Sequence, residues 1–186
     1  MTPSQLTISL PDWLAARPMP SHINSITERL QLVLDIARDN VSHASGGPFA
    51  AAVFALDNGE LLAIACNRVV PEHCSIAHAE MLAIGLAQQR LQQHSLNDQR
   101  GWQLVSSAEP CAMCTAAIDW SGIRDVVYGA GRDDVETIGF NEGNKPDNWR
   151  EALENKGIRV HGPLLQKQAT DVLQYYQSQQ GIIYNP

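Results

Sequence analysis

The sequence predicts an α/β protein, a three-layer α/β/α sandwich with a mixed sheet of about five strands. Asn-Gly at positions 58–59 separates two apolar runs, residues 49–56 and 61–66, which indicates an antiparallel hairpin. The later strand segments alternate with helical segments, which favours right-handed crossovers and parallel pairing. The 186 residues are 44% hydrophobic and 18% charged, which suits one globular domain with a sizeable core.

The individual elements follow from hydrophobic periodicity and turn signals. We expect helices over residues 25–41, 76–91, 111–120, 149–155 and 164–176, and strands over residues 49–56, 61–66, 102–106, 124–130 and 158–160. The first helix has apolar residues at three- and four-residue steps, and Gly46-Gly47-Pro48 ends it. Pro110 lies at or near the first position of the third helix, where proline is tolerated. A polar loop is expected between the fourth strand and the fourth helix.

The ends of the chain are expected to differ from the domain between them. Residues 1–24 carry four prolines and are predicted to be an extended lead-in. Residues 25–186 are predicted to form the domain, with residues 177–186 as its tail. No run approaches the ~20 apolar residues of a membrane-spanning helix, and the first residues lack the pattern of a secretory signal. We therefore expect no membrane partner and a cytoplasmic location.

The charge balance argues against a polynucleotide partner. The formal net charge is −7, and the 13 lysines and arginines are scattered without a cluster. A nucleic-acid binder usually carries a basic face, because contacts to phosphates dominate its affinity. We therefore expect no nucleic-acid partner.

Two short motifs together predict a metal site. Cys111 and Cys114 are three apart, so a helix would place both sulfurs on one face of its first turn, where thiolates are stabilised. His78 and Glu80 begin another long helix, and both side chains can point past its end. Two helix N-termini facing each other would hold one zinc ion per subunit. Three protein ligands leave a fourth position for water, which is the pattern of a catalytic zinc site.

The chemistry of such a site points to hydrolysis. Zinc lowers the pKa of its bound water toward ~7 and gives hydroxide at neutral pH. Glu80 is the candidate carrier of the proton, from the water to a ring nitrogen and then to a leaving amine. A closed structural site would need a fourth ligand from His73 or Cys74, and would leave Glu80 without a role. The combined pattern, His-x-Glu with Pro-Cys-x-x-Cys, is the signature of zinc base deaminases.

These motifs resemble the cytidine/deoxycytidylate deaminase superfamily. The matching segments are residues 78–81 (His-Ala-Glu-Met), 109–114 (Glu-Pro-Cys-Ala-Met-Cys) and 47–49 (Gly-Pro-Phe), and the similarity covers most of residues 25–160. Within the superfamily the chain is most similar to bacterial guanine deaminases. That similarity rests on Asn67, on residues 117–120 (Ala-Ile-Asp-Trp), on residues 138–142 (Ile-Gly-Phe-Asn-Glu) and on the aromatic tail. The strand order inferred above fits the cytidine deaminase-like fold.

The resemblance implies a role for each site residue. It implies that zinc is held by His78, Cys111 and Cys114, that protons are carried by Glu80, and that the base is bound by Asn67, Phe49, Trp120, Glu142 and Tyr184. In that set Asn67 bonds the purine, Phe49 and Trp120 shape or stack against the ring, and Tyr184 belongs to a tail that closes the pocket. The tail can come from a partner subunit in such enzymes, and the resemblance implies a homodimer. Ala50 and Ala108 depart from common family residues but lie outside the catalytic set.

The hydrogen-bonding pattern of the base favours guanine. Guanine presents two donors, N1–H and the exocyclic amine, and an ionised carboxylate at Glu142 can accept both. Adenine presents an acceptor at N1, which a carboxylate would repel. Glu142 lies near the amine in this arrangement and can assist proton transfer. The sequence therefore predicts hydrolysis of the free purine guanine to xanthine and ammonia.

Other functions stay open at the level of sequence. A tRNA adenosine deaminase would share the zinc chemistry, although the net charge and Glu142 argue against it. Deaminases of cytosine, of a nucleoside or of a triazine are further alternatives. The non-enzymatic alternative is a zinc-binding scaffold, which would give Glu80 no function.

Overall fold

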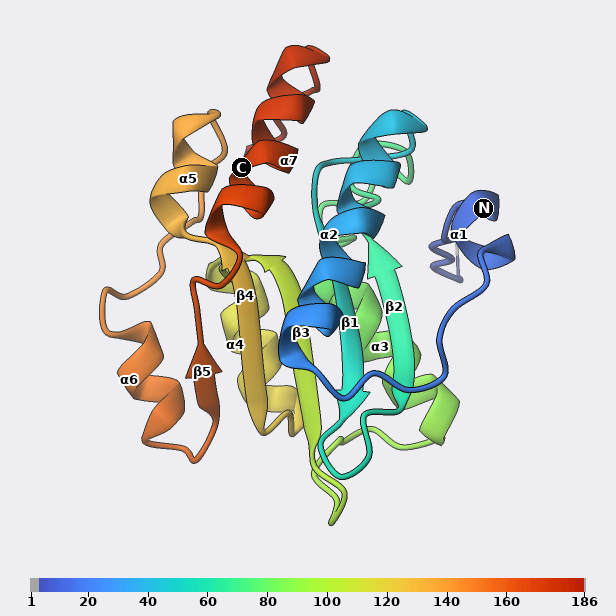
Figure 1. Ribbon diagram of the computed structural model, residues 1–186, viewed down its shortest axis with the longest axis vertical. Helices are drawn as coiled ribbons and strands as arrows, with labels where there is room; N and C mark the ends of the chain where they lie inside the picture. Colours follow the sequence, from blue (N-terminus) through green and yellow to red (C-terminus); the bar gives the residue numbers. More distant parts are fainter. Residues whose placement is uncertain (1–3, 186) are drawn as a thin grey trace.

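A five-stranded mixed sheet forms the centre of the computed structural model, which describes residues 4–185 (Figure 1). Residues 1–3 of the predicted lead-in and residue 186 of the predicted tail lie outside the described residues. The strands are β1 (Ala50–Ala55), β2 (Leu61–Cys66), β3 (Trp102–Ala108), β4 (Asp125–Ala130) and β5 (Arg159–His161). The helices are α1 (Asp12–Ala16), α2 (Ile26–Ser42), α3 (Ala79–Leu91), α4 (Ala112–Ser121), α5 (Arg132–Thr137), α6 (Trp149–Glu154) and α7 (Gln166–Ser178).

The strand pairing follows the predicted directions. The sheet order is β2-β1-β3-β4-β5. β1 is antiparallel to both β2 and β3, whereas β3, β4 and β5 are mutually parallel. The expected hairpin and the expected parallel crossovers are therefore confirmed.

Helices cover both faces of the sheet. Figure 1 shows α2 and α7 on the near face, with α3 and α4 behind the strands. Every residue of β1, β3 and β4 is buried, and β1 accordingly consists of apolar residues alone. Two clusters of buried side chains, one on each face, form the core. The predicted three-layer fold is confirmed.

Two short helices differ from the prediction. α1 lies inside the segment expected to be extended; it follows Pro11 and buries Leu14. α5 lies in the expected polar loop, and its N-terminus is fixed by the Asp134 side chain, which accepts a bond from the Gly131 N–H at 2.8 Å. Helices of five or six residues span too few turns to show a periodic pattern. Tertiary packing therefore determines whether such short segments are helical. Within residues 4–185, no helix is long and apolar enough to cross a membrane.

Candidate active site

One edge of the sheet gathers the segments that form the site. Ala51 of β1 lies opposite Ser106 of β3, and Ala108 of β3 lies beside Ala130 of β4. The start of β1 and the ends of β2, β3 and β4 therefore meet at this edge, because β1 runs against its two neighbours. α4 begins a few residues after β3, so its N-terminus lies at the same edge.

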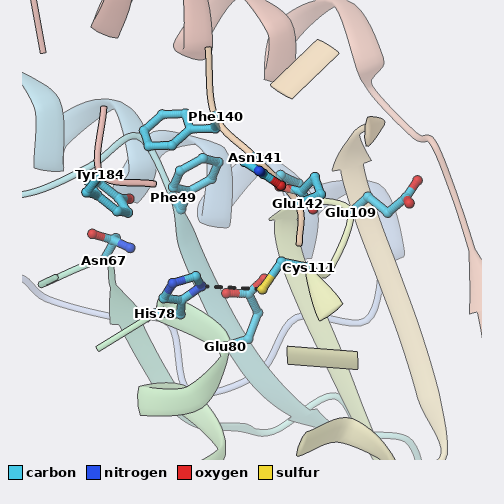
Figure 2. A pocket seen from close by; sticks show the side chains of 11 residues that line it. Phe49, Asn67, His78, Glu80, Glu109, Cys111, Phe140, Asn141, Glu142 and Tyr184 are labelled. Atoms are coloured by element: carbon cyan, nitrogen blue, oxygen red, sulfur yellow. Dashed lines mark hydrogen bonds between the residues drawn. The ribbon is translucent and has the colours of Figure 1, made fainter. Parts of the chain in front are cut away.

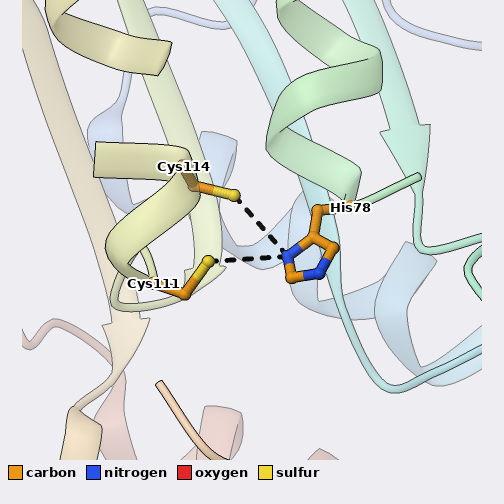
Figure 3. Close-up of side chains that lie close together, drawn as sticks. All are labelled: His78, Cys111 and Cys114. Carbon is orange, nitrogen blue, oxygen red and sulfur yellow. Dashed lines mark hydrogen bonds between the residues drawn. The ribbon is translucent and has the colours of Figure 1, made fainter. Parts of the chain in front are cut away.

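The three predicted metal ligands meet between two helix N-termini (Figure 3). His78 is the N-cap of α3, Cys111 is the N-cap of α4, and Cys114 lies in the first turn of α4. The Nδ1 atom of His78 lies 3.6 Å from each cysteine sulfur. Neither His73 nor Cys74 belongs to this ligand group among the described residues, so a four-ligand closed site has no support.

The geometry of this group fits zinc. Zinc–sulfur bonds of about 2.3 Å and zinc–nitrogen bonds of about 2.05 Å at a tetrahedral angle place nitrogen and sulfur about 3.6 Å apart. The observed separations of 3.6 Å match that spacing. The hydrogen bond with Cys114 lowers the pKa of the Cys111 thiol to about 4, and a bond with His78 acts in the same direction. The ligand group is therefore preorganised to present a thiolate to a cation.

Glu80 is a buried carboxyl group beside the metal ligands. It lies in the first turn of α3 and is 6% exposed. Ser106 of β3 donates a hydrogen bond to its Oε1 at 3.3 Å. Burial raises the pKa of Glu80, because desolvation disfavours the carboxylate. A raised pKa brings such a group toward the range in which it exchanges protons at neutral pH.

A pocket opens above the metal ligands and Glu80 (Figure 2). Its lining residues are Phe49, Asn67, His78, Glu80, Ala108, Glu109, Cys111, Phe140, Asn141, Glu142 and Tyr184. The lining contains every predicted site residue except Cys114 and Trp120. Cys114 lies next to the pocket, beside the His78 ring. Figure 2 shows the aromatic rings on one side of the pocket, Glu142 and Glu109 on the other side, and Glu80 below them beside His78.

Asn67 is held in one orientation at the end of β2. Its backbone N–H donates to the Phe49 carbonyl at 2.9 Å, and its backbone carbonyl accepts from the Asn40 side chain at 3.0 Å. The Oδ1 atom of Asn67 accepts from the Val69 N–H at 3.2 Å. The side-chain amide is therefore oriented by the protein, and its N–H donors are the groups left for a ligand.

An aromatic wall is formed by Phe49, Phe140 and Tyr184. The Phe140 ring is 5.1 Å from the Phe49 ring and 4.9 Å from the Tyr184 ring, both in edge-to-face contact. Asn185 fixes the tail: its Oδ1 accepts from the Asn141 N–H and its Nδ2 donates to the Gly139 carbonyl, each at 2.8 Å. The tail thus packs against the loop that carries Phe140 and covers the pocket of its own chain.

Gly47 leaves room for that tail. A Cβ atom built at this glycine would overlap the hydroxyl group of Tyr184. The close approach of Tyr184 to the backbone therefore depends on the missing side chain at position 47.

Two buried polar atoms in this pocket have no hydrogen-bond partner among residues 4–185. They are Oε2 of Glu142 and the hydroxyl oxygen of Tyr184. Burial raises the pKa of Glu142 to about 8, against the opposing charge of Lys145. Hydrogen-bond donors from a ligand would stabilise the Glu142 carboxylate and lower that pKa. Unpaired buried polar groups are costly, so their presence in the pocket points to a polar ligand.

Trp120 does not reach the pocket. Its side chain is 87% exposed and is not among the lining residues. The physical reason is the length of α4: nine residues after Cys111 at 1.5 Å per residue place Trp120 about 13 Å along the helix from the metal end. The predicted contact between Trp120 and the ring is therefore not formed within this chain.

Sequence reasoning assigned no role to several residues in and around the pocket. Glu109 lines the pocket, Lys145 is buried behind Glu142, and Asn185 fixes the tail. Glu109 was visible only as a neighbour of the cysteine motif. Lys145 lies in a polar loop and Asn185 lies in a short tail, and neither segment has a periodic pattern that distinguishes a buried or bonded side chain from a free one.

A His-Cys-Cys ligand group and a buried glutamate, held at two helix N-termini beside a mixed sheet, define the class of zinc-binding deaminases. The family model described as the cytidine and deoxycytidylate deaminase zinc-binding region matches residues 24–130, more than half of the chain. The chain belongs to this family.

Similar proteins include members with different bases in their names. The solved structure of guanine deaminase from Nitrosomonas europaea is 45% identical, with a TM-score of 0.90, covering 96% of this chain and 99% of that one. Guanine deaminase of Bacillus subtilis is 34% identical over 61% of this chain and 69% of its own length. A probable cytosine deaminase of Schizosaccharomyces pombe is 32% identical over 72% of this chain and 78% of its own length.

Proposed function

We propose that this chain hydrolyses free guanine to xanthine and ammonia. The observation that carries the proposal is the Glu142 carboxyl group, buried in the pocket with Oε2 unpartnered. When ionised, this carboxyl group only accepts hydrogen bonds, and the guanine edge offers two adjacent donors, N1–H and the amine, that would stabilise the carboxylate. The 45% identity with guanine deaminase from Nitrosomonas europaea over nearly the whole chain supports the same substrate.

The metal would be held by His78, Cys111 and Cys114. Bound zinc supplies a Lewis acid that lowers the pKa of a coordinated water molecule to about 7. Glu80 would take one proton from water and deliver it to a ring nitrogen as the hydroxyl group adds to the carbon that bears the amine. It would then take the second proton, from that added hydroxyl group, and deliver it to the departing amine, so that water and guanine give xanthine and ammonia. Ser106 holds one oxygen of Glu80 through its hydroxyl group during these transfers.

The remaining rim residues orient the base. Glu142 accepts from the two guanine donors, and its position near the amine allows it to assist the proton transfers. Asn67 donates its side-chain N–H groups to acceptors on the opposite part of the purine. Phe49 and the tail residue Tyr184 cover the ring faces, and the Tyr184 hydroxyl group is free to bond a ligand. The ring is thereby held while its amine faces Glu80.

The alternatives receive less support. A tRNA adenosine deaminase would need a basic face, and the formal net charge is −7. An adenine ring would also place its N1 acceptor against Glu142. Cytosine has an acceptor at N3, next to its amine, so it meets the same conflict. A zinc scaffold would leave the buried Glu80 without a purpose.

We further propose that the protein acts as a homodimer in the cytoplasm with a small-molecule partner only. The large exposed side chain of Trp120 is a candidate dimer contact, because exposed tryptophan is enriched at interfaces. Sedimentation analysis of the wild-type chain and Trp120→Ser tests this assignment. A monomeric wild-type chain would contradict it.

Ammonia release from a panel of bases tests the substrate. We expect the purified zinc-loaded chain to act on guanine and to leave adenine, cytosine, guanosine and triazines largely unchanged. Glu80→Ala with full zinc content is the control for contaminating activity. Release from cytosine or a triazine but not from guanine would overturn the substrate assignment.

A further inference from the structure

Lys145 is a buried lysine in the loop between α5 and α6. Its side chain is 1% exposed, and it lies behind the pocket rather than among the lining residues. Burying an ammonium group is costly unless the charge is paired and hydrogen-bonded. The partners of this ammonium group therefore indicate why the position holds a lysine.

The ammonium group joins the metal-binding segment to Glu142. Its Nζ donates to Oε1 of Glu109 at 2.5 Å and to the carbonyl of Pro110 at 2.8 Å, and these two residues precede the ligand Cys111. On its other side, Nζ lies 3.8 Å from Oε2 of Glu142. One cation thus contacts two carboxylates that line the pocket from different segments.

Further contacts fix the turn around this cation. The backbone N–H of Lys145 donates to the Gly143 carbonyl at 2.9 Å, and the Ala112 N–H donates to the Glu142 carbonyl at 3.0 Å. The ammonium group also lies 4.9 Å from the centre of the Trp149 ring, at the start of α6. The loop, α4 and α6 therefore meet around Lys145.

We propose that Lys145 is a positioning residue for base binding, which holds the Glu142 carboxylate in place relative to the metal-binding segment. This inference rests on the proposed function, because it gives Lys145 a part in recognising the base. The positive charge offsets repulsion between Glu109 and Glu142, so both carboxylates can face one pocket. The separation of 3.8 Å leaves Oε2 of Glu142 free to accept from the base.

A double-mutant cycle tests this coupling. Guanine affinity is measured by calorimetry in the Glu80→Gln variant, in which the base is bound but turnover is suppressed. We expect Lys145→Met to weaken guanine binding by about tenfold or more when Glu142 is present, and by less than about threefold when Glu142 is replaced by Gln. Equal losses in both backgrounds would overturn the proposal.

Matched variants separate positioning from general destabilisation. Lys145→Met leaves the Glu109 carboxylate without its ionic partner. Guanine affinity is therefore also measured in the double variant Lys145→Met/Glu109→Gln, in which both partners of the Lys145–Glu109 bond are replaced. Lys167→Met, in an ion pair whose lysine is 85% exposed, is the surface control and should leave affinity unchanged. Loss of zinc from both Lys145 variants would overturn the proposal, because Lys145 would then support only the metal segment.

Two further measurements sharpen the result. Lys145→Arg keeps the charge but changes its shape, so we expect it to recover part of the affinity that Lys145→Met loses. If the wild-type chain acts on another base and not on guanine, the substrate assignment fails. The same cycle with the accepted base then tests Lys145, and equal losses there would overturn this inference separately.

Discussion

The metal-binding part and the base-reading part of the pocket are built in different ways. His78 and Cys111 cap helices, and Glu80 and Cys114 follow within the first turns, so local structure orients all four. The base-reading part joins the end of β2, a loop after α5 and the C-terminal tail. The first part depends on two helices of the core, and the second depends on contacts between a strand end, a loop and the tail, which lie far apart in the sequence.

Because the two parts are built differently, we expect substitutions in them to have different effects on activity and on metal content. Loss of a metal ligand removes the chemistry for every base. Loss of a rim contact changes which base is held, or how tightly, while the metal stays bound. The predictions below test that separation.

The largest effect is expected for Cys111→Ser. A serine hydroxyl group is a poor zinc ligand, so zinc content and ammonia release should both fall to background. Metal analysis and an ammonia assay measure the two quantities. Cys74→Ser is the matched control, since Cys74 lies outside the ligand group, and it should keep both. Full zinc content with full turnover in Cys111→Ser would remove this residue from the metal site.

Glu80→Gln should separate chemistry from metal binding. The amide cannot carry the proton, so we expect kcat to fall about 100- to 10,000-fold while zinc content is unchanged. Ser106→Ala, which removes the bond to Glu80 Oε1 and a longer bond accepted from the Ala108 N–H, should reduce kcat by about three- to tenfold. Steady-state kinetics with metal analysis provides the check, and unaltered turnover in Glu80→Gln would exclude the proton-carrying role.

Glu142→Gln should affect the base rather than the metal. The amide presents a donor to the guanine donors, so kcat/KM for guanine should fall about 10- to 1,000-fold with zinc retained. Glu136→Gln, on the exposed side of α5, is the matched control and should behave like the wild type. If Glu142→Gln turned over guanine normally, Glu142 would not be the base-reading residue.

At the tail we expect a smaller effect than that of Glu142→Gln, and an effect on KM rather than on kcat. Asn185→Ala removes two hydrogen bonds, to Asn141 and Gly139, each worth about 1 kcal/mol, so KM for guanine should rise by up to about thirtyfold with little change in kcat. Asn155→Ala, at the exposed end of α6, should leave KM unchanged. A normal KM in Asn185→Ala would show that the tail does not contribute to binding.

The metal part and the sheet were predictable because their signals are local. Ligand spacing on a helix and apolar periodicity both act within a few turns, and the predicted ligand group and mixed sheet are found. Trp120 shows the limit of a resemblance, because its helix carries it away from the pocket. Lys145 and Asn185 could not be predicted, since their burial and bonding arise from segments that meet only in the folded chain.

The glycine at position 47 is a feature of the sequence that indicates how the tail packs over the pocket. In this chain the absent Cβ provides the space that the Tyr184 hydroxyl group occupies. In a relative with a larger residue at this position, the end of the corresponding tyrosine ring has to shift or another residue has to take its place. Comparing position 47 with the tail across the family would therefore sort members by how they close over the base.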